Sequence, residues 1–138
     1  MRIAVIDGQG GGLGRSIVEA LRRALSPDIE IIALGTNAIA TAAMLKAGAD
    51  AGATGENAIT VTCSSCDIIV GPLGIVAANS MFGELTPAMA LAVAASPAQK
   101  FLLPTTRCNL NVVGYPSKSL SATLESLVVE IQEFLAQA

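Results

Sequence analysis

The sequence predicts a doubly wound α/β fold, in which a mostly parallel sheet carries helices on both faces. Short apolar stretches typical of strands alternate along the 138 residues with amphipathic stretches of helical length. The strand stretches are almost continuously apolar, as expected where both faces of a parallel sheet are covered. Hydrophobic residues make up 52% of the chain and charged residues 14%, which indicates a buried core rather than disorder. We expect a single domain over residues 1–138.

The N-terminal part of the chain predicts two strands that flank one helix. Residues 3–6 form an apolar strand, and residues 29–34 form a second one. The apolar stripe of the helix between them consists of Leu13, Ile17, Leu21 and Leu25. Pro27 follows this helix, which cannot continue through a proline.

The next part predicts a capped helix, a loop and a short strand. Thr36 or Asn37 is placed to cap a helix that runs to about residue 47. Residues 50–57 are rich in glycine and polar residues and predict a loop. The β-branched residues in 58–62 favour a strand, with the start of a short helix as the alternative.

The C-terminal half predicts two more strands and two more helices. The strands are expected at residues 67–70 and 100–103. Thr86 followed by Pro87 is typical of a helix start, and this helix is expected to end near residue 95. The last helix, at residues 121–136, has the clearest stripe: Leu124, Leu127, Val128, Ile131, Phe134 and Leu135.

The most informative stretch is the turn from the first strand into the first helix, which holds five glycines in seven positions. Glycines let the backbone approach a phosphate with no Cβ between them, and a helix N-terminus offers unpaired amides. A turn that only packs a helix on a sheet needs one or two glycines. The turn therefore predicts a nucleotide or other phosphate-bearing ligand, contacted by Gly8, Gln9, Gly10, Gly11, Gly12, Leu13 and Gly14.

Three other segments are expected to meet this loop, because ligands of doubly wound sheets lie beyond the carboxyl ends of the strands. Most of their residues are small or uncharged hydrogen-bonding groups, which suit a ribose or a base. Ordinary turn and capping chemistry is the alternative, and Glu56 is either a ribose ligand, a general base or a solvated acid. The candidate ligand residues of these segments are Thr36, Asn37, Glu56, Asn57, Gly71 and Pro72.

The glycine spacing G-x-x-x-G-x-G resembles the cofactor loop of the short-chain dehydrogenases, which implies NAD(P) or another nucleotide as cofactor. The likeness is confined to the N-terminal part. Tyr115 and Lys118 are three residues apart, whereas that family's catalytic pair is four apart. The second strand also lacks the usual acid that binds ribose, so we expect no preference for unphosphorylated NAD through an acidic clamp. Arg15 is then either a ligand of a ribose phosphate or a solvated helix residue.

Most of the chain resembles a bacterial family of short proteins that is classed as a domain of unknown function. The motifs that carry this resemblance are DGQGGGLG, LGTNAIATAAMLKAGA, GATGENAI and GPLGIVAANSMFGELTP. The resemblance implies a bacterial, soluble protein and brings no activity with it.

Composition argues against several kinds of partner. A net charge of −3, with three Phe, one Tyr and no Trp, argues against nucleic acid. Histidine is absent, and the pair Cys63 and Cys66 has only Cys108 to join it, so we expect no metal. No apolar run has the length of a membrane-spanning helix, and the N-terminus opens directly into a strand. We therefore expect a cytoplasmic protein with no membrane partner.

Two kinds of function fit these features. The first is a sensing or binding module, or an accessory subunit, that holds a nucleotide and performs no chemistry. The alternative is a small oxidoreductase or another enzyme that acts on a phosphorylated small molecule. The absent histidine and the altered Tyr/Lys spacing favour the first.

One apolar segment is left over, at residues 73–85. It predicts the surface of a homo-oligomer, and a buried helix or a lid over the ligand are the alternatives.

Overall fold

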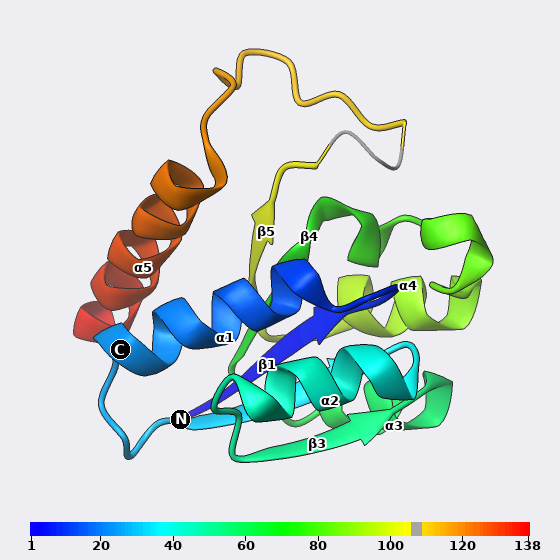
Figure 1. Cartoon of the computed structure of the whole chain (residues 1–138), viewed down its shortest axis with the longest axis horizontal. Helices are drawn as coiled ribbons and strands as arrows, with labels where there is room; N and C mark the ends of the chain where they lie inside the picture. The colour runs from blue at the N-terminus through cyan, green and yellow to red at the C-terminus, as the bar shows by residue number, and fades with distance from the viewer. Residues whose placement is uncertain (106–108) are drawn as a thin grey trace.

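The computed structural model describes residues 1–105 and 109–138, and it contains a five-stranded parallel sheet with helices on both faces (Figure 1). The strand order is β3-β2-β1-β4-β5. The strands are β1 (Arg2–Asp7), β2 (Glu30–Gly35), β3 (Ala51–Thr54), β4 (Ile68–Pro72) and β5 (Gln99–Leu103). Because the chain winds from β1 outward in both directions, the order reverses between β1 and β4. The Rossmann-like, doubly wound fold that the sequence predicts is thereby confirmed.

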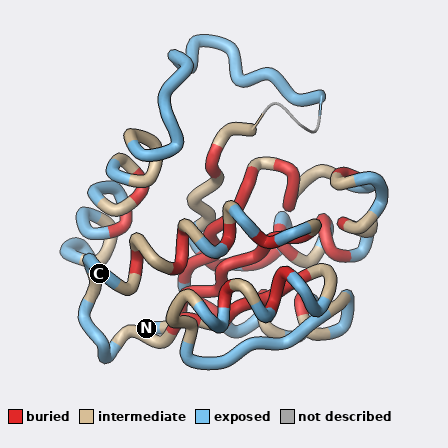
Figure 2. Tube along the Cα trace, viewed as in Figure 1, coloured by how far each residue is buried: buried red, intermediate tan, exposed pale blue. Residues whose placement is uncertain are grey.

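The helices divide between the two faces of the sheet, so the molecule has two apolar cores (Figure 2). One face carries α1 (Gly12–Ala24), α2 (Ala38–Lys46) and α5 (Leu120–Gln137), and the other carries α3 (Glu56–Cys63) and α4 (Pro87–Ala95). Successive β1 side chains alternate between the cores: Ile3 and Val5 enter the first, and Ala4 and Ile6 enter the second. This burial on both faces explains the continuously apolar strands.

Two helix starts follow the capping chemistry that the sequence predicts. The Asn37 side chain accepts a hydrogen bond from the amide of Ala40 at 2.9 Å and caps α2. The Thr86 hydroxyl accepts one from the amide of Met89 at 3.2 Å, and Pro87 is the first residue of α4.

Two predictions for the middle of the chain are wrong. Strand β3 lies inside the predicted loop 50–57; its residues are small and all exposed, so it lacks the apolar pattern of the other strands. The segment 58–62 is helical, as part of α3, rather than a strand. Ile59 and Cys63, four residues apart, are both buried in the second core, and this packing outweighs the modest strand preference of β-branched residues.

Residues 73–85 are neither strand nor continuous helix. They form two short 3₁₀ turns, η1 (Leu73–Val76) and η2 (Met81–Gly83), so a buried helix is excluded as an interpretation. Ile75 and Leu85 are buried in the second core, whereas Phe82 at the tip is fully exposed. Met81 and Phe82 both have left-handed backbone angles, with φ of 58° and 56°, which are uncommon for bulky residues. The segment is thus anchored at both ends with a strained tip.

The two cysteines of the C-x-x-C motif are buried thiols on the α3/α4 side of the sheet. Burial is the main cause that raises the pKa of Cys63, to about 12, and it also raises the pKa of Cys66. Cys108 lies outside the described residues. Among the residues described, no cluster of three or more His, Cys, Asp or Glu side chains has the arrangement of a metal site.

Residues 109–119 form an exposed arm that arches away from the sheet between β5 and α5 (Figure 1). No helix in the described part of the chain is long and apolar enough to cross a membrane.

The helical assignment of α3 can be tested by two truncations two residues apart. In a strand, Ile59 and Val61 would face the same side; in α3, Ile59 is fully buried and Val61 is 59% exposed. We expect Ile59→Ala to lower the free energy of unfolding by about 2–5 kcal/mol. Val61→Ala should change it by less than about 0.5 kcal/mol. Urea denaturation of both variants measures these changes. An equally large loss of unfolding free energy in both variants would indicate that the segment is a strand.

Candidate functional site

The carboxyl ends of β1 and β2 bring the glycine loop (residues 8–14) against the turn Gly35-Thr36-Asn37. The amide of Thr36 donates to the carbonyl of Asp7 at 3.0 Å, and the Asn37 side chain donates to the carbonyl of Gln9 at 2.9 Å. Two of the predicted segments therefore meet, as expected for the carboxyl ends of two adjacent parallel strands.

Three of the five loop glycines are required by packing inside the chain. A Cβ on Gly8 would lie 2.5 Å from the Thr36 hydroxyl oxygen and 2.6 Å from the Met81 sulfur. Gly11 has a left-handed φ of 74°, and a Cβ there would lie 2.7 Å from the backbone of Ala40. A Cβ on Gly14 would lie 2.6 Å from the Met44 sulfur. Contacts within the chain thus account for more glycines than the sequence alone suggests.

The other two glycines, Gly10 and Gly12, have no such explanation. A Cβ built on either meets nothing within 4 Å, and neither has a left-handed φ. Both residues are exposed. Within residues 1–105 and 109–138, no hydrogen bond is made by the amides of Gly10, Gly12 and Leu13. The loop therefore has three amides without a partner in the described chain at the start of α1, beside two positions without side chains.

Asp7, which was not among the predicted ligand residues, hydrogen-bonds both ends of the glycine loop. Its carboxylate is buried, at 6% exposure, and accepts from the amide of Gly8 at 2.8 Å and from the amide of Gly14 at 2.7 Å. It thus satisfies one amide of the first turn of α1 and places negative charge beside the positive end of the helix dipole. The signal in the sequence is an acid directly after a buried strand.

Glu84 is the second residue that the sequence analysis missed, and it lies far from the loop in sequence. One carboxylate oxygen, Oε1, accepts from the Gln9 amide at 2.9 Å, the Thr36 hydroxyl at 2.7 Å and the Asn37 side-chain amide at 2.7 Å. These bonds join the glycine loop, the turn after β2 and the segment between η2 and α4. An isolated acid after an apolar segment carries no sequence signal for such a contact.

The same hydrogen bonds govern the acidity of Glu84. The bond from the Gln9 amide lowers the pKa of this carboxyl most, and the bond from the Thr36 hydroxyl lowers it further. A carboxylate held by three donors is ionised at neutral pH and anchors the end of the 73–85 segment on the glycine loop.

The remaining predicted residues lie in other surroundings. Glu56 is exposed at the start of α3 and accepts from the Thr86 hydroxyl at 2.6 Å, and Asn57 is exposed beside it. Gly71 and Pro72 are buried at the end of β4, and a Cβ on Gly71 would lie 2.5 Å from the carbonyl oxygen of Ile6. Leu13 packs against the first core. Within the described chain, none of these residues hydrogen-bonds the Glu84 carboxylate, whose donors are Gln9, Thr36 and Asn37.

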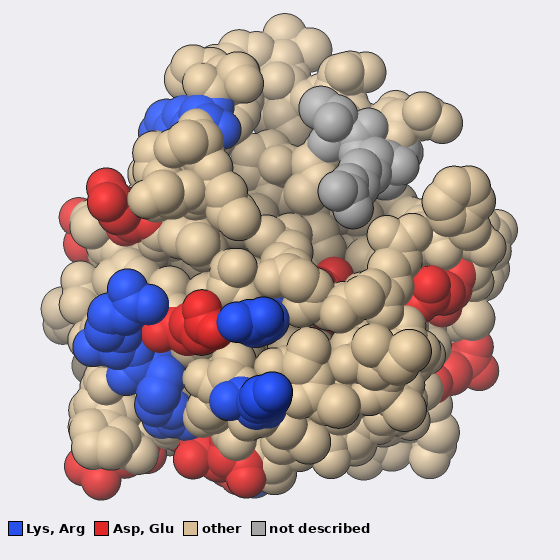
Figure 3. Space-filling view, viewed as in Figure 1, with Lys and Arg blue, Asp and Glu red and all other residues tan. Residues whose placement is uncertain are grey.

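Positive side chains are concentrated over α1 and α2 (Figure 3), but mostly away from the glycine loop. Arg22 and Arg23 are in the last turn of α1, and Lys46 is in the last turn of α2. Arg15 is nearer the loop, where it is 63% exposed and pairs with Glu19 at 3.1 Å. The solvated-helix interpretation therefore describes Arg15, and among the described residues the loop offers an anion backbone amides rather than cationic side chains.

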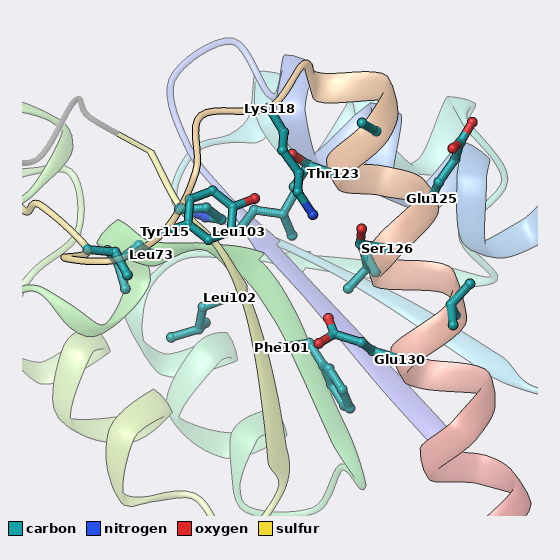
Figure 4. Close-up of a pocket in the computed structure, with 15 residues that line it drawn as sticks. Leu73, Phe101, Leu102, Leu103, Tyr115, Lys118, Thr123, Glu125, Ser126 and Glu130 are labelled. Atoms are coloured by element: carbon teal, nitrogen blue, oxygen red, sulfur yellow. The ribbon is translucent and has the colours of Figure 1, made fainter.

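A separate cavity of about 880 Å³ lies between β5, α5 and the exposed arm (Figure 4). Its walls include Phe101 and Leu103 of β5 together with Ser126 and Glu130 of α5. Tyr115 and Lys118 of the arm also line it, with the Lys118 nitrogen 5.9 Å from the centre of the Tyr115 ring. None of the predicted ligand residues lines this cavity.

The distinction between the two groups of glycines can be tested through stability. Gly14→Ala should lower the free energy of unfolding by about 1–3 kcal/mol, because its Cβ meets Met44 and Asp7. Gly12→Ala should raise that energy by about 0.4–1 kcal/mol, since alanine restricts the unfolded chain and meets no atom in the fold. Chemical denaturation measures both, and a large loss in Gly12→Ala would show that the chain itself requires this glycine.

The Glu84 anchor predicts a contribution to the acid dependence of stability. The folded-state pKa is lower than in the unfolded chain, so the stabilisation is complete above the ordinary glutamate pKa, about 4.3, and is lost as pH falls through the folded value. In Glu84→Gln, the free energy of unfolding should fall less steeply below about pH 5 than in the parent. Denaturation series across this pH range measure the two slopes, and identical slopes would contradict the assignment.

Comparison with solved structures identifies a similar fold. The crystal structure of a dodecameric, FMN-dependent UbiX-like decarboxylase from Escherichia coli O157:H7 matches with a TM-score of 0.52 and 15% sequence identity. The match covers 99% of this chain and 95% of the decarboxylase. A comparison with curated proteins gives no match. The family "Domain of unknown function (DUF3842)" matches residues 2–136, and the chain therefore belongs to this family.

Proposed function

We propose that the glycine loop binds the phosphate of a nucleotide-type cofactor. The observation that carries this proposal is the pair Gly10 and Gly12, which neither packing nor backbone angles require. A Cβ at either position would meet no atom within 4 Å, and both positions adjoin the three amides that have no partner in the described chain. Glycine is needed at these two positions only if another molecule approaches the backbone closely there.

The electrostatics of the loop limit where the phosphate lies. The amide of Gly14 already donates to the Asp7 carboxylate, so this amide is not available to a phosphate. The amides of Gly10, Gly12 and Leu13 have no partner in the described chain and stand at the start of α1, where a phosphate also meets the positive end of the helix dipole. The bound phosphate is thus held by backbone groups outside the buried acid.

The cofactor class follows from the sequence and from the fold together. The glycine spacing resembles a loop that binds NAD(P), and the solved structure of similar fold is FMN-dependent. These molecules share a phosphate ester on a sugar or sugar alcohol. We infer a binding or sensing module, or an accessory subunit, that holds such a cofactor, since no described side chain at the loop is placed as a nucleophile or a histidine base.

Self-association belongs to the same proposal. The similar solved structure is a dodecamer, and this chain exposes apolar residues at Phe82 and in the arm, including Val113 at 97% exposure. The interface at residues 73–85 stays a prediction that rests on the exposed tip alone, because Ile75 and Leu85 are buried within the chain.

The proposal predicts that Gly12→Asp abolishes cofactor binding without loss of fold. The new carboxylate would stand beside the amides without a partner and repel a phosphate, whereas its Cβ meets no atom of the chain within 4 Å. Isothermal titration with FMN, NAD⁺ and NADP⁺ should show binding of at least one to the parent. Gly12→Asp should bind that cofactor at least about tenfold more weakly.

A matched control separates the local effect from added charge. Ser121→Asp places the same group in the exposed first turn of α5, after the Ser119 cap, and should bind the cofactor as the parent does. Equal affinity in Gly12→Asp and the parent would contradict the proposal, as would a parent that binds none of the three cofactors.

A further inference from the structure

We propose that Glu84 is the acidic residue that binds a free sugar hydroxyl of the cofactor, in place of the acid that the end of β2 lacks. This inference rests on the proposed function of the glycine loop. It narrows the ligand to a cofactor whose sugar hydroxyls carry no phosphate at this position, either the ribose of a dinucleotide or the ribityl chain of a flavin.

The first support is the place of the carboxylate. In doubly wound folds, the acid that binds ribose usually stands at the end of the second strand. Here β2 ends at Gly35 and continues into Thr36 and Asn37. The Glu84 carboxylate lies 2.7 Å from the polar side-chain atoms of both Thr36 and Asn37, so the chain brings an acid to this point from a distant segment.

The second support is the unequal use of the two carboxylate oxygens. All three hydrogen bonds end on Oε1. Within residues 1–105 and 109–138, Oε2 accepts none, and the side chain is only half buried. One oxygen therefore fixes the side chain. The other oxygen of the ionised carboxylate can accept a hydrogen bond from a hydroxyl group of a ligand.

The third support is that the donors are themselves fixed. Asn37 uses its side-chain oxygen to cap α2 and its nitrogen to reach both Gln9 and Glu84. The Glu84 carboxylate is consequently held beside the glycine loop by a cap that α2 needs for its own start. Such a preorganised acceptor loses little freedom when a ligand binds.

The inference reverses the specificity expected from the sequence. An end of β2 without an acid predicts no preference for unphosphorylated NAD. An ionised Glu84 at that place repels a phosphate on the same sugar, because two negative charges would meet at close range. We therefore expect NAD⁺ to bind more tightly than NADP⁺ if the cofactor is a dinucleotide.

Glu84→Gln is the decisive variant, since it keeps the size of the side chain and one acceptor oxygen. The glutamine carbonyl can accept the same three hydrogen bonds, so the anchor is kept, while the carboxylate charge and the free acceptor are lost. Glu133→Gln removes one charge from an exposed site on α5 and serves as the control. The Gln9 amide resonance in NMR spectra reports whether the anchor survives.

Titrations of NAD⁺, NADP⁺ and FMN into the parent and both variants test the inference. We expect Glu84→Gln to bind NAD⁺ or FMN at least about tenfold more weakly than the parent, and Glu133→Gln to bind with the affinity of the parent. For a dinucleotide, the ratio of NAD⁺ to NADP⁺ affinity should also fall by about tenfold in Glu84→Gln. A loss confined to FMN assigns the hydroxyl to ribityl, and a loss confined to NAD⁺ assigns it to ribose.

The contrary outcomes separate this inference from the proposal beneath it. If Glu84→Gln binds as tightly as the parent while Gly12→Asp does not bind, Glu84 has no role and the loop proposal stands. If Glu84→Gln binds more tightly, the carboxylate competes with the ligand and the inference is wrong. If the parent binds none of the three, both proposals fail.

Discussion

The buried carboxylate of Asp7 accepts hydrogen bonds from amides at both ends of the glycine loop, and the conformation of the loop depends on this contact. One oxygen binds Gly8 at the exit from β1, and the other binds Gly14 inside the first turn of α1. The loop must therefore return on itself within a few residues. Gly11 provides the left-handed turn, and the absence of a Cβ there lets α2 approach at Ala40. What remains outside this closed arrangement is the exposed pair Gly10 and Gly12.

Glu84 accepts a hydrogen bond from the loop at Gln9, so two acids with different surroundings stand at the carboxyl ends of β1 and β2. Asp7 is buried at the helix start, and each of its two oxygens accepts a hydrogen bond from a loop amide. Glu84 is half buried and is anchored through one oxygen. The strained tip at Met81 and Phe82 lies between this anchor and η1, as strained backbone often does near functional sites. Anchor and tip together connect the proposed cofactor site to the most exposed aromatic residue of the chain.

The sequence predicts the architecture well where burial follows a simple period. The apolar strands at residues 3–6, 29–34, 67–70 and 100–103 and the caps Asn37 and Thr86 are confirmed, and so is the α5 stripe except at Val128, which is not part of the core. Prediction fails where tertiary packing overrides local preference. Ile59 and Cys63 turn a β-branched segment into a helix, and the small exposed residues of β3 pair with β2 without an apolar pattern.

The candidate site was predictable only in part, for reasons that lie in its geometry. The contact between Gln9, Thr36 and Asn37 follows from strand order, because carboxyl ends of adjacent parallel strands meet. Which glycines serve packing could not be predicted, since Gly8, Gly11 and Gly14 are constrained by residues on other elements. Glu84 was not predictable either, because 75 residues separate it from the Gln9 amide that it binds.

The central claim is that Gly10 and Gly12 are glycines because a cofactor phosphate approaches their amides. Amide chemical shifts in ¹H–¹⁵N NMR spectra, followed while FMN or NAD⁺ is added, test this claim most directly. The account predicts that the largest shifts occur at Gly10, Gly12 and Leu13, whose amides have no partner in the described chain. Saturable shifts confined to the cavity around Tyr115 and Lys118, with the loop amides unchanged, would contradict it.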